Sequence, residues 1–296
     1  MAGKVLCEAT KLYNILNQHI NGRTRLSESN YLCLIDARAA DSYHGSHIIT
    51  ARQAKRDSEG RFIMPADVEV ESMKFIIVYD SATQSLSDSG PASDCAERLE
   101  NSSRFPIQIL SGGYERFSAL YPFLRTHTIL YTIRELESLN PYPVEILAGQ
   151  LYMGDYKQAT NPEILRDLKL SALVNVSDEC SLMFKKAKCS VLHIRTADSA
   201  QADFTASFER LCVFIGSHLN MASPVLIFSS LGLSRCCAVA VAYLMHHLKY
   251  TLQEAWTHVQ QCKPNMRPNP GLVVQLSQWE LQTVGKRLTD ISEHDY

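Results

Sequence analysis

The 296-residue sequence lacks the features that mark membrane proteins and nucleic-acid-binding proteins. It has no apolar run near the roughly 18 residues that a membrane-spanning helix needs. It does not begin with a charged segment followed by an apolar one, so no signal peptide or typical transit peptide is evident. The formal net charge is only −2, which argues against nucleic acid as the main ligand. We expect no membrane insertion and no nucleic-acid partner.

Metal-binding cysteine patterns are missing as well. The nine cysteines include no Cys-x-x-Cys pair, and no histidines accompany them at zinc spacing, so we expect no metal and no cofactor. Cys33, Cys212 and Cys236 lie inside apolar runs, where a cysteine is usually a small buried hydrophobic residue. An odd number of such cysteines in a long chain favours a reducing compartment. We expect a cytoplasmic protein, with mitochondrial import by an atypical route as the alternative.

What the sequence does contain is an alternation of helical and strand patterns. In the first half, strand-like runs at Tyr31–Asp36, Phe75–Tyr79 and Ile107–Leu110 are separated by helical segments. Such alternation predicts a mainly parallel sheet covered by helices. A polar segment that ends in Asn140-Pro141-Tyr142-Pro143 then interrupts the pattern, as a boundary between domains does.

The alternation starts again after these prolines. We predict strands around residues 145–147, 151–153, 173–176, 191–194 and 224–227, and helices around residues 162–168, 204–218, 235–248, 251–262 and 270–286. The sequence therefore predicts an α/β protein of two domains, each with a central sheet flanked by helices. We place the first domain at residues 1–128, a linker at 129–142, the second domain at 143–286 and a polar tail at 287–296.

The most informative segment runs from Val225 to Arg235. An apolar strand leads into a short loop around Gly232, and Arg235 opens an alanine-rich helix. The backbone N–H groups of such a loop, the positive end of the helix dipole and the arginine fork all favour an anion, and the glycine lets the backbone approach it. We therefore predict a phosphate-binding loop. Its residues are Ser230, Leu231, Gly232, Leu233, Ser234 and Arg235.

This segment resembles the signature of the cysteine-dependent dual-specificity phosphatases, which is His-Cys, two residues, Gly, two residues, Arg. Aligning Gly232 and Arg235 places Phe228 at the histidine position and Ser229 at the cysteine position. Asp198 lies where the family keeps its general acid. The resemblance extends over most of the second predicted domain, and it implies the dual-specificity phosphatase fold there.

Both departures from the signature affect the chemistry. In the family, the cysteine is a thiolate nucleophile, its pKa lowered by the loop dipoles and the arginine. The hydroxyl of Ser229 would stay neutral at pH 7, and the adjacent Phe228 is no base. We therefore expect no functional catalytic residue. Phe228 and Ser229 are interpreted as degenerate, and Asp198 as a vestigial general acid.

No other cysteine is placed to act instead. Cys189 and Arg195 repeat the spacing from cysteine to arginine, but the residues between them include no glycine and predict a strand. Cys236 and Cys237 directly follow Arg235, so we expect them in the helix, out of reach of a bound phosphate.

A second pattern lies in the first predicted domain. It consists of Asp36-Ala37-Arg38, Tyr43, Ser46-His47-Ile48 and Leu110–Phe117. This pattern resembles the rhodanese-like domain of MAP-kinase phosphatases. A sulfurtransferase needs a cysteine just after the strand that ends at Asp80, and this chain has Ser81 and Ala82 there, so we expect no sulfur transfer.

The same resemblance implies docking of a kinase through a basic cluster. The nearest counterpart is Arg52, Lys55 and Arg56, which is sparser than the arginine run of the family and is followed by Asp57 and Glu59. Kinase docking and an ordinary solvated loop are equally good interpretations of this cluster.

The domain order and the Phe-Ser signature resemble the serine/threonine/tyrosine-interacting class of pseudophosphatases. We therefore predict a catalytically inactive protein phosphatase that binds phosphorylated proteins, among them MAP kinases or other phosphatases, and regulates phosphorylation-dependent signalling as a scaffold or competitor. Two alternatives stay open. One is a weakly active protein phosphatase in which Asp198 assists direct attack by water, and the other is a scaffold that uses only the rhodanese-like domain.

Overall fold

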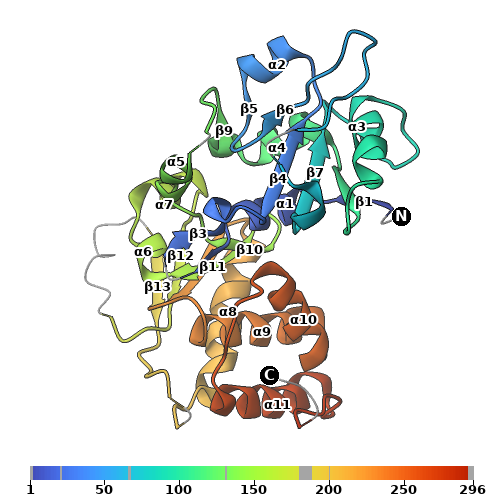
Figure 1. The fold of residues 1–296 in the computed structure, drawn as a ribbon. Helices are drawn as coiled ribbons and strands as arrows, with labels where there is room; N and C mark the ends of the chain where they lie inside the picture. The colour runs from blue at the N-terminus through green and yellow to red at the C-terminus, as the bar shows by residue number, and fades with distance from the viewer. Residues whose placement is uncertain are drawn as a thin grey trace. The chain divides into compact units, whose positions relative to one another are not determined.

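The chain forms two compact units, Met1–Pro141 and Tyr142–Tyr296. The computed structural model describes residues 3–20, 22–65, 68–130, 132–179, 189–199 and 201–292. Figure 1 shows the helices and strands in chain order. Within the described ranges, no helix has both the length and the apolar character needed to cross a membrane.

The first unit is built on a five-stranded sheet in which all neighbouring strands run parallel. The order across the sheet is β1 (Lys4–Cys7), β8 (Ile107–Leu110), β7 (Phe75–Tyr79), β4 (Leu32–Asp36) and β6 (Arg52–Gln53). The residues of β7 and β8 are buried almost throughout, as expected for strands with both faces covered. The predicted parallel sheet is confirmed.

Helices and short strands surround this sheet. The α-helices are α1 (Ala9–Leu16), α2 (Ala40–Gly45), α3 (Pro91–Glu100), α4 (Gly113–Leu120) and α5 (Ile133–Glu137). The 3₁₀-helices are η1 (Arg25–Ser27), η2 (Val70–Ser72) and η3 (Pro122–Leu124). Two short antiparallel pairs join β2 (His19–Ile20) to β3 (Arg23–Thr24) and β5 (His47–Ile48) to β9 (Arg125–Thr126). Buried residues of α3 share one apolar core with β7 and β8.

The second unit contains a mixed five-stranded sheet. Its order is β10 (Val144–Leu147), β11 (Leu151–Asp155), β14 (Val225–Ser229), β12 (Ala172–Asn175) and β13 (Ser190–His193). The edge pair β10–β11 is antiparallel, and the other neighbours are parallel. The helices are α6 (Tyr156–Ala159), α7 (Pro162–Asp167), α8 (Thr205–Asn220), α9 (Arg235–Leu248), α10 (Leu252–Cys262) and α11 (Pro270–Val284). The predicted α/β fold class is therefore confirmed.

Helix α9 is the most deeply buried helix of the second unit. Every residue from Arg235 to Met245 is buried. A helix that is covered on all sides is apolar on all sides, as this stretch is after Arg235. It packs against α8, α10 and α11 (Figure 1), and it follows the central strand β14, whose residues are all buried. Because the core holds both β14 and α9, the loop between them is fixed at both ends.

Two helices of the first unit differ from the sequence expectation. Helix α5 lies inside the segment predicted as a linker, because Thr132 and Glu135 form a capping box that starts a short helix there. The sequence pattern does not predict α3, since a polar stretch rich in Ser and Asp precedes it. Its start is marked by Pro91, which suits the first turn of a helix.

Candidate functional site

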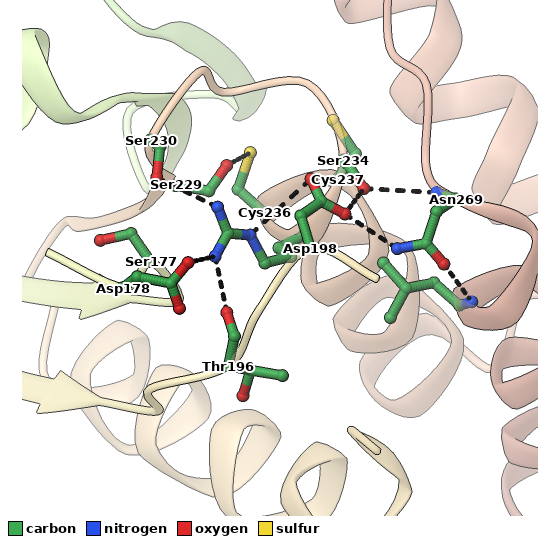
Figure 2. Close-up of polar contacts among 12 residues, drawn as sticks. Ser177, Asp178, Thr196, Asp198, Ser229, Ser230, Ser234, Cys236, Cys237 and Asn269 are labelled. Carbon is green, nitrogen blue, oxygen red and sulfur yellow. Dashed lines mark hydrogen bonds and ion pairs between the residues drawn. The ribbon is translucent and has the colours of Figure 1, made fainter. Parts of the chain in front are cut away.

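The predicted phosphate-binding loop lies at the carboxyl end of β14, between Ser229 and the first residue of α9, Arg235. The neighbouring strands β11 and β12 run parallel to β14. Since parallel strands end at the same edge of a sheet, residues that follow β12 lie close to this loop. Figure 2 shows the side chains that converge there.

The backbone of the loop has free donors. The N–H groups of Ser230 to Ser234 donate to no acceptor in the described part of the chain, although Gly232 and Ser234 are buried. Buried N–H groups are nearly always paired, so a run of unpaired ones indicates room for an anionic partner. Helix α9 begins directly after them, and its dipole adds positive potential at this end.

Gly232 determines the path of the loop. Its φ of 68° lies in the left-handed region. A β-carbon at this position would meet the carbonyl oxygen of Gly154 at 2.8 Å. Because Gly154 belongs to β11, the glycine lets the loop pack directly on the neighbouring strand. The glycine thus permits a close approach of the loop to β11.

Arg235 extends under the loop, with its side chain 5% exposed. Nη1 donates to the carbonyl oxygen of Thr196 at 2.6 Å and to Asp178 Oδ2 at 3.4 Å. Nη2 donates to Ser230 Oγ at 3.0 Å. Nε is buried and makes no hydrogen bond, although Asp198 Oδ2 lies 3.8 Å away (Figure 2). The guanidinium is therefore anchored through Nη1, while its Nε side keeps donor capacity for an anion.

Asp198 joins the loop to the segment before α11. Its Oδ1 accepts a hydrogen bond from Ser234 Oγ at 2.7 Å and another from Asn269 Nδ2 at 2.8 Å. Asn269 also caps α11, because its side chain accepts from the N–H of Leu272. Asp198, at the predicted general-acid position, thus holds the loop in place through hydrogen bonds. This structural role involves no proton transfer.

Ser229 has no base beside it. Its side chain is buried, and its Oγ donates to Cys236 Sγ at 3.3 Å (Figure 2). In the part of the chain that the structure describes, this is the hydrogen bond that Ser229 Oγ makes, and no histidine, lysine or carboxylate contacts it. Phe228 is fully buried, with its ring centre 6.2 Å from that of Tyr156. Serine attack on phosphorus needs a base, and among the described residues the contact of Ser229 Oγ is with a sulfur instead.

Cys236 and Cys237 lie in α9 as expected, and both are fully buried. The structure adds that the sulfur of Cys236 accepts a hydrogen bond from Ser229, the residue at the predicted nucleophile position. Burial raises the pKa of the Cys237 thiol well above its usual value, which keeps this thiol neutral. The window from Cys189 to Arg195 contains β13, as the sequence predicts.

Two acidic residues of the site, Asp178 and Glu179, are missed by the sequence analysis. Glu179 Oε2 accepts from Ser230 Oγ at 2.7 Å, while Asp178 contacts Arg235. Burial raises the pKa of Glu179, but hydrogen bonds from Ser177 and Ser230 and the charge of Arg235 outweigh it and hold the pKa below its usual value. Position is the signal that could have identified them, because they closely follow a strand parallel to β14.

The residues considered for kinase docking lie in the first unit. Arg52 belongs to β6, and Lys55 and Arg56 follow it as exposed residues. Arg52 and Lys55 line one cavity of about 490 Å³, together with largely apolar neighbours. Arg56 does not line it, and its Nη1 donates instead to the carbonyl oxygen of Gly60. The structure thus brings two of the three basic residues together.

The Asp36 and Arg38 pair of the first unit has a structural role. Arg38 donates to both carboxylate oxygens of Asp36, and the hydroxyl of Tyr79 donates to the same carboxylate. The Arg38 guanidinium also lies 3.7 Å from the ring centre of Tyr114. These contacts join β4, β7 and α4.

Among the described residues, no group of three or more His, Cys, Asp or Glu side chains could hold a metal ion.

Comparisons with known proteins match both units. Residues 151–282 match the family "Dual specificity phosphatase, catalytic domain", and residues 21–120 match "Rhodanese-like domain". Dual specificity protein phosphatase 4 of Rattus norvegicus is 31% identical over 269 residues, which cover 80% of this chain and 67% of that protein. Dual specificity protein phosphatase 16 of Homo sapiens is 25% identical over 279 residues, 86% of this chain and 41% of that protein. A crystal structure of human tyrosine phosphatase-like serine/threonine/tyrosine-interacting protein matches with a TM-score of 0.43 and 25% identity, over 47% of this chain and 95% of that one.

Proposed function

The chain belongs to the dual-specificity phosphatase family, with a rhodanese-like domain before the phosphatase domain, and we propose that it binds phosphorylated proteins without hydrolysing them. One observation carries this proposal. The loop keeps a row of free backbone donors and a buried arginine, whereas the side chain at the nucleophile position is Ser229, bonded to a buried sulfur. Binding needs the first two features, and hydrolysis needs a nucleophile as well.

The missing nucleophile is a chemical defect rather than a geometric one. A cysteine in this loop would ionise because the loop amides, the helix dipole and Arg235 all stabilise a thiolate. A serine hydroxyl is far less acidic than a thiol, and in the described part of the chain no histidine, lysine or carboxylate contacts Ser229 Oγ to remove its proton. Positioning of a phosphate by the loop does not replace the activated nucleophile.

The proposed partners follow from the relatives. Several curated relatives are dual-specificity protein phosphatases, and one is named "MAP kinase phosphatase with leucine-rich repeats protein 3". We infer that this chain engages phosphorylated MAP kinases or the phosphatases that act on them, as a competitor or scaffold. Arg52 and Lys55 are the proposed docking residues of the first unit. The described cysteines form no disulfide, and we propose a reducing compartment such as the cytoplasm.

The test is hydrolysis of a small aryl phosphate by the wild type and by the Phe228→His/Ser229→Cys variant. We expect a silent wild type and, in the double variant, hydrolysis on the order of 100-fold or more above it, since Arg235, Asp198 and the loop amides remain in place. The single Phe228→His variant is the matched control and should stay silent. Hydrolysis by the wild type would overturn the proposal.

A second candidate function is a scaffold in which the phosphate loop is unused. The observation that favours it is that Arg235 already contacts Asp178 and lies near Asp198. Capture of partners by the wild type and by Arg235→Ala distinguishes the two. Loss of capture in a folded variant supports phosphate recognition, and unchanged capture supports the scaffold.

A further inference from the structure

The mouth of the phosphate-binding loop contains two carboxylates that already use its donors. Glu179 Oε2 accepts from the hydroxyl of Ser230, and that hydroxyl in turn accepts from Nη2 of Arg235. Asp178 Oδ2 lies 3.4 Å from Nη1 of Arg235. Both acidic residues come from the segment after β12, so they reach the loop from a separate element. Figure 2 labels Asp178 and Ser230, which contact Nη1 and Nη2 of Arg235 respectively.

These carboxylates leave other hydrogen-bond donors of the site free. Arg235 is buried, and its Nε has no hydrogen bond within the described part of the chain. The N–H groups of Ser230 to Ser234 are without an acceptor there too. A phosphate with three terminal oxygens could use both sets, but full engagement of Ser230 and Nη2 requires the Ser230–Glu179 hydrogen bond to break.

Charge adds a second cost to phosphate entry. In the described structure, the charged side chains within ion-pair distance of Arg235 are Asp178 and Asp198, and Glu179 is linked to it through Ser230. The Arg235 guanidinium thus faces three carboxylates, while the charge of Lys263 also acts on Cys236 and Cys237 beside the loop. A phosphate dianion brought against this group is repelled by the carboxylates unless a further cation arrives with it.

We infer that Asp178 and Glu179 compete with the phosphate for Ser230 and Arg235, and that the loop therefore selects phosphorylated segments that carry a basic side chain beside the phosphate. This inference rests on the proposed function. The phosphate takes Arg235 and the loop amides, and the basic side chain of the ligand takes the carboxylates that the phosphate displaces. Asp178 can be reached from solvent, because its side chain is 56% exposed.

The experiment measures binding of synthetic peptides to the full chain by fluorescence anisotropy. The peptides carry a threonine or a tyrosine, with and without phosphate, and are flanked by either two arginines or two glutamines. The proteins are the wild type, the Asp178→Asn/Glu179→Gln variant and a matched control, Glu209→Gln. Glu209 is an exposed carboxylate of α8 that makes no hydrogen bond or ion pair with the loop within the described ranges, so its removal changes charge without touching the site.

We expect the wild type to bind the arginine-flanked phosphopeptide more tightly than the glutamine-flanked one. Two exposed charge pairs correspond to about a 2- to 30-fold preference. In Asp178→Asn/Glu179→Gln the preference should shrink towards unity, and the glutamine-flanked phosphopeptide should bind more tightly than it binds to the wild type. Glu209→Gln should behave as the wild type does. Phosphate-dependent binding in the double variant alone would overturn the inferred selection, because the wild type would then fail to bind the arginine-flanked phosphopeptide.

Failure of this inference and failure of the proposed function give different results. Phosphate-dependent binding with the same flank preference in the wild type and in the double variant overturns the inference and leaves the proposed function standing. If no protein distinguishes a phosphopeptide from its unphosphorylated counterpart, both are overturned.

Discussion

Replacing Gly232 by alanine tests whether contact with β11 shapes the loop. At φ 68° a β-carbon costs about 1–2 kcal/mol in the left-handed region. The added carbon would also lie 2.8 Å and 2.9 Å from the carbonyl oxygen and carbon of Gly154, which are backbone atoms of a sheet strand and cannot rotate away. Overpacking of this kind costs about 1–3 kcal/mol. We therefore expect Gly232→Ala to lower the free energy of unfolding by about 2–5 kcal/mol.

Gly285→Ala is the matched control. Gly285 follows α11 and has a φ of 83°, but a β-carbon there would meet nothing within 4 Å. It should therefore cost about 1–2 kcal/mol, the left-handed strain alone. The difference between the two variants isolates the contact with Gly154.

The assay is urea unfolding followed by tryptophan fluorescence. The chain has two tryptophans, Trp256 and Trp279, and both are buried in the second unit, so the signal reports on the unit that holds the loop. Equal losses in Gly232→Ala and Gly285→Ala would refute the reasoning, because they would mean that the loop moves off β11 at no cost.

Two further predictions use the same fluorescence assay. Thr251→Ala removes the capping box of α10, in which Thr251 accepts from the N–H of Glu254, and should lower the free energy of unfolding by about 1 kcal/mol; an unchanged value would contradict this role. The pKa of Glu179 is lowered in the folded chain, so its carboxylate contributes stability above its unfolded pKa near 4.5, and that contribution is lost as the pH falls through the folded value. The wild type should therefore lose more stability than Glu179→Gln between about pH 5 and pH 3, and equal losses would count against the Ser230 contact.

The regular elements were the predictable part of the fold. β7 and β8 have the predicted bounds because each is a short apolar run between polar turns, and α9 begins and ends where its alanine-rich apolar stretch does. Helix α2 could not be predicted in this way, since it is short and Tyr43 is its single buried residue. Its stability comes from contacts with other elements, which no local pattern records.

A local pattern predicted the candidate site only where its residues are adjacent in the chain, and Asp198 was identified through the family resemblance instead. Gly232 and Arg235 belong to one local pattern of strand, loop and helix. The contact between Glu179 and Ser230 depends instead on how β12 is aligned with β14, in which Asn175 lies opposite Phe228. That register is fixed by packing in the core and not by either segment alone.

The contacts that shape the loop do not involve the side chain of Ser229. Gly232 packs on β11, the carbonyl oxygen of Thr196 holds Arg235, and Asp198 braces the loop from the side. The hydroxyl of Ser229 bonds to a sulfur behind the loop and carries none of these contacts. Under the proposed function, a hydroxyl in place of a thiol would therefore remove the nucleophile and leave the contacts that shape the loop in place. Hydrolysis would need one residue more than binding does, so it could be lost while binding is kept.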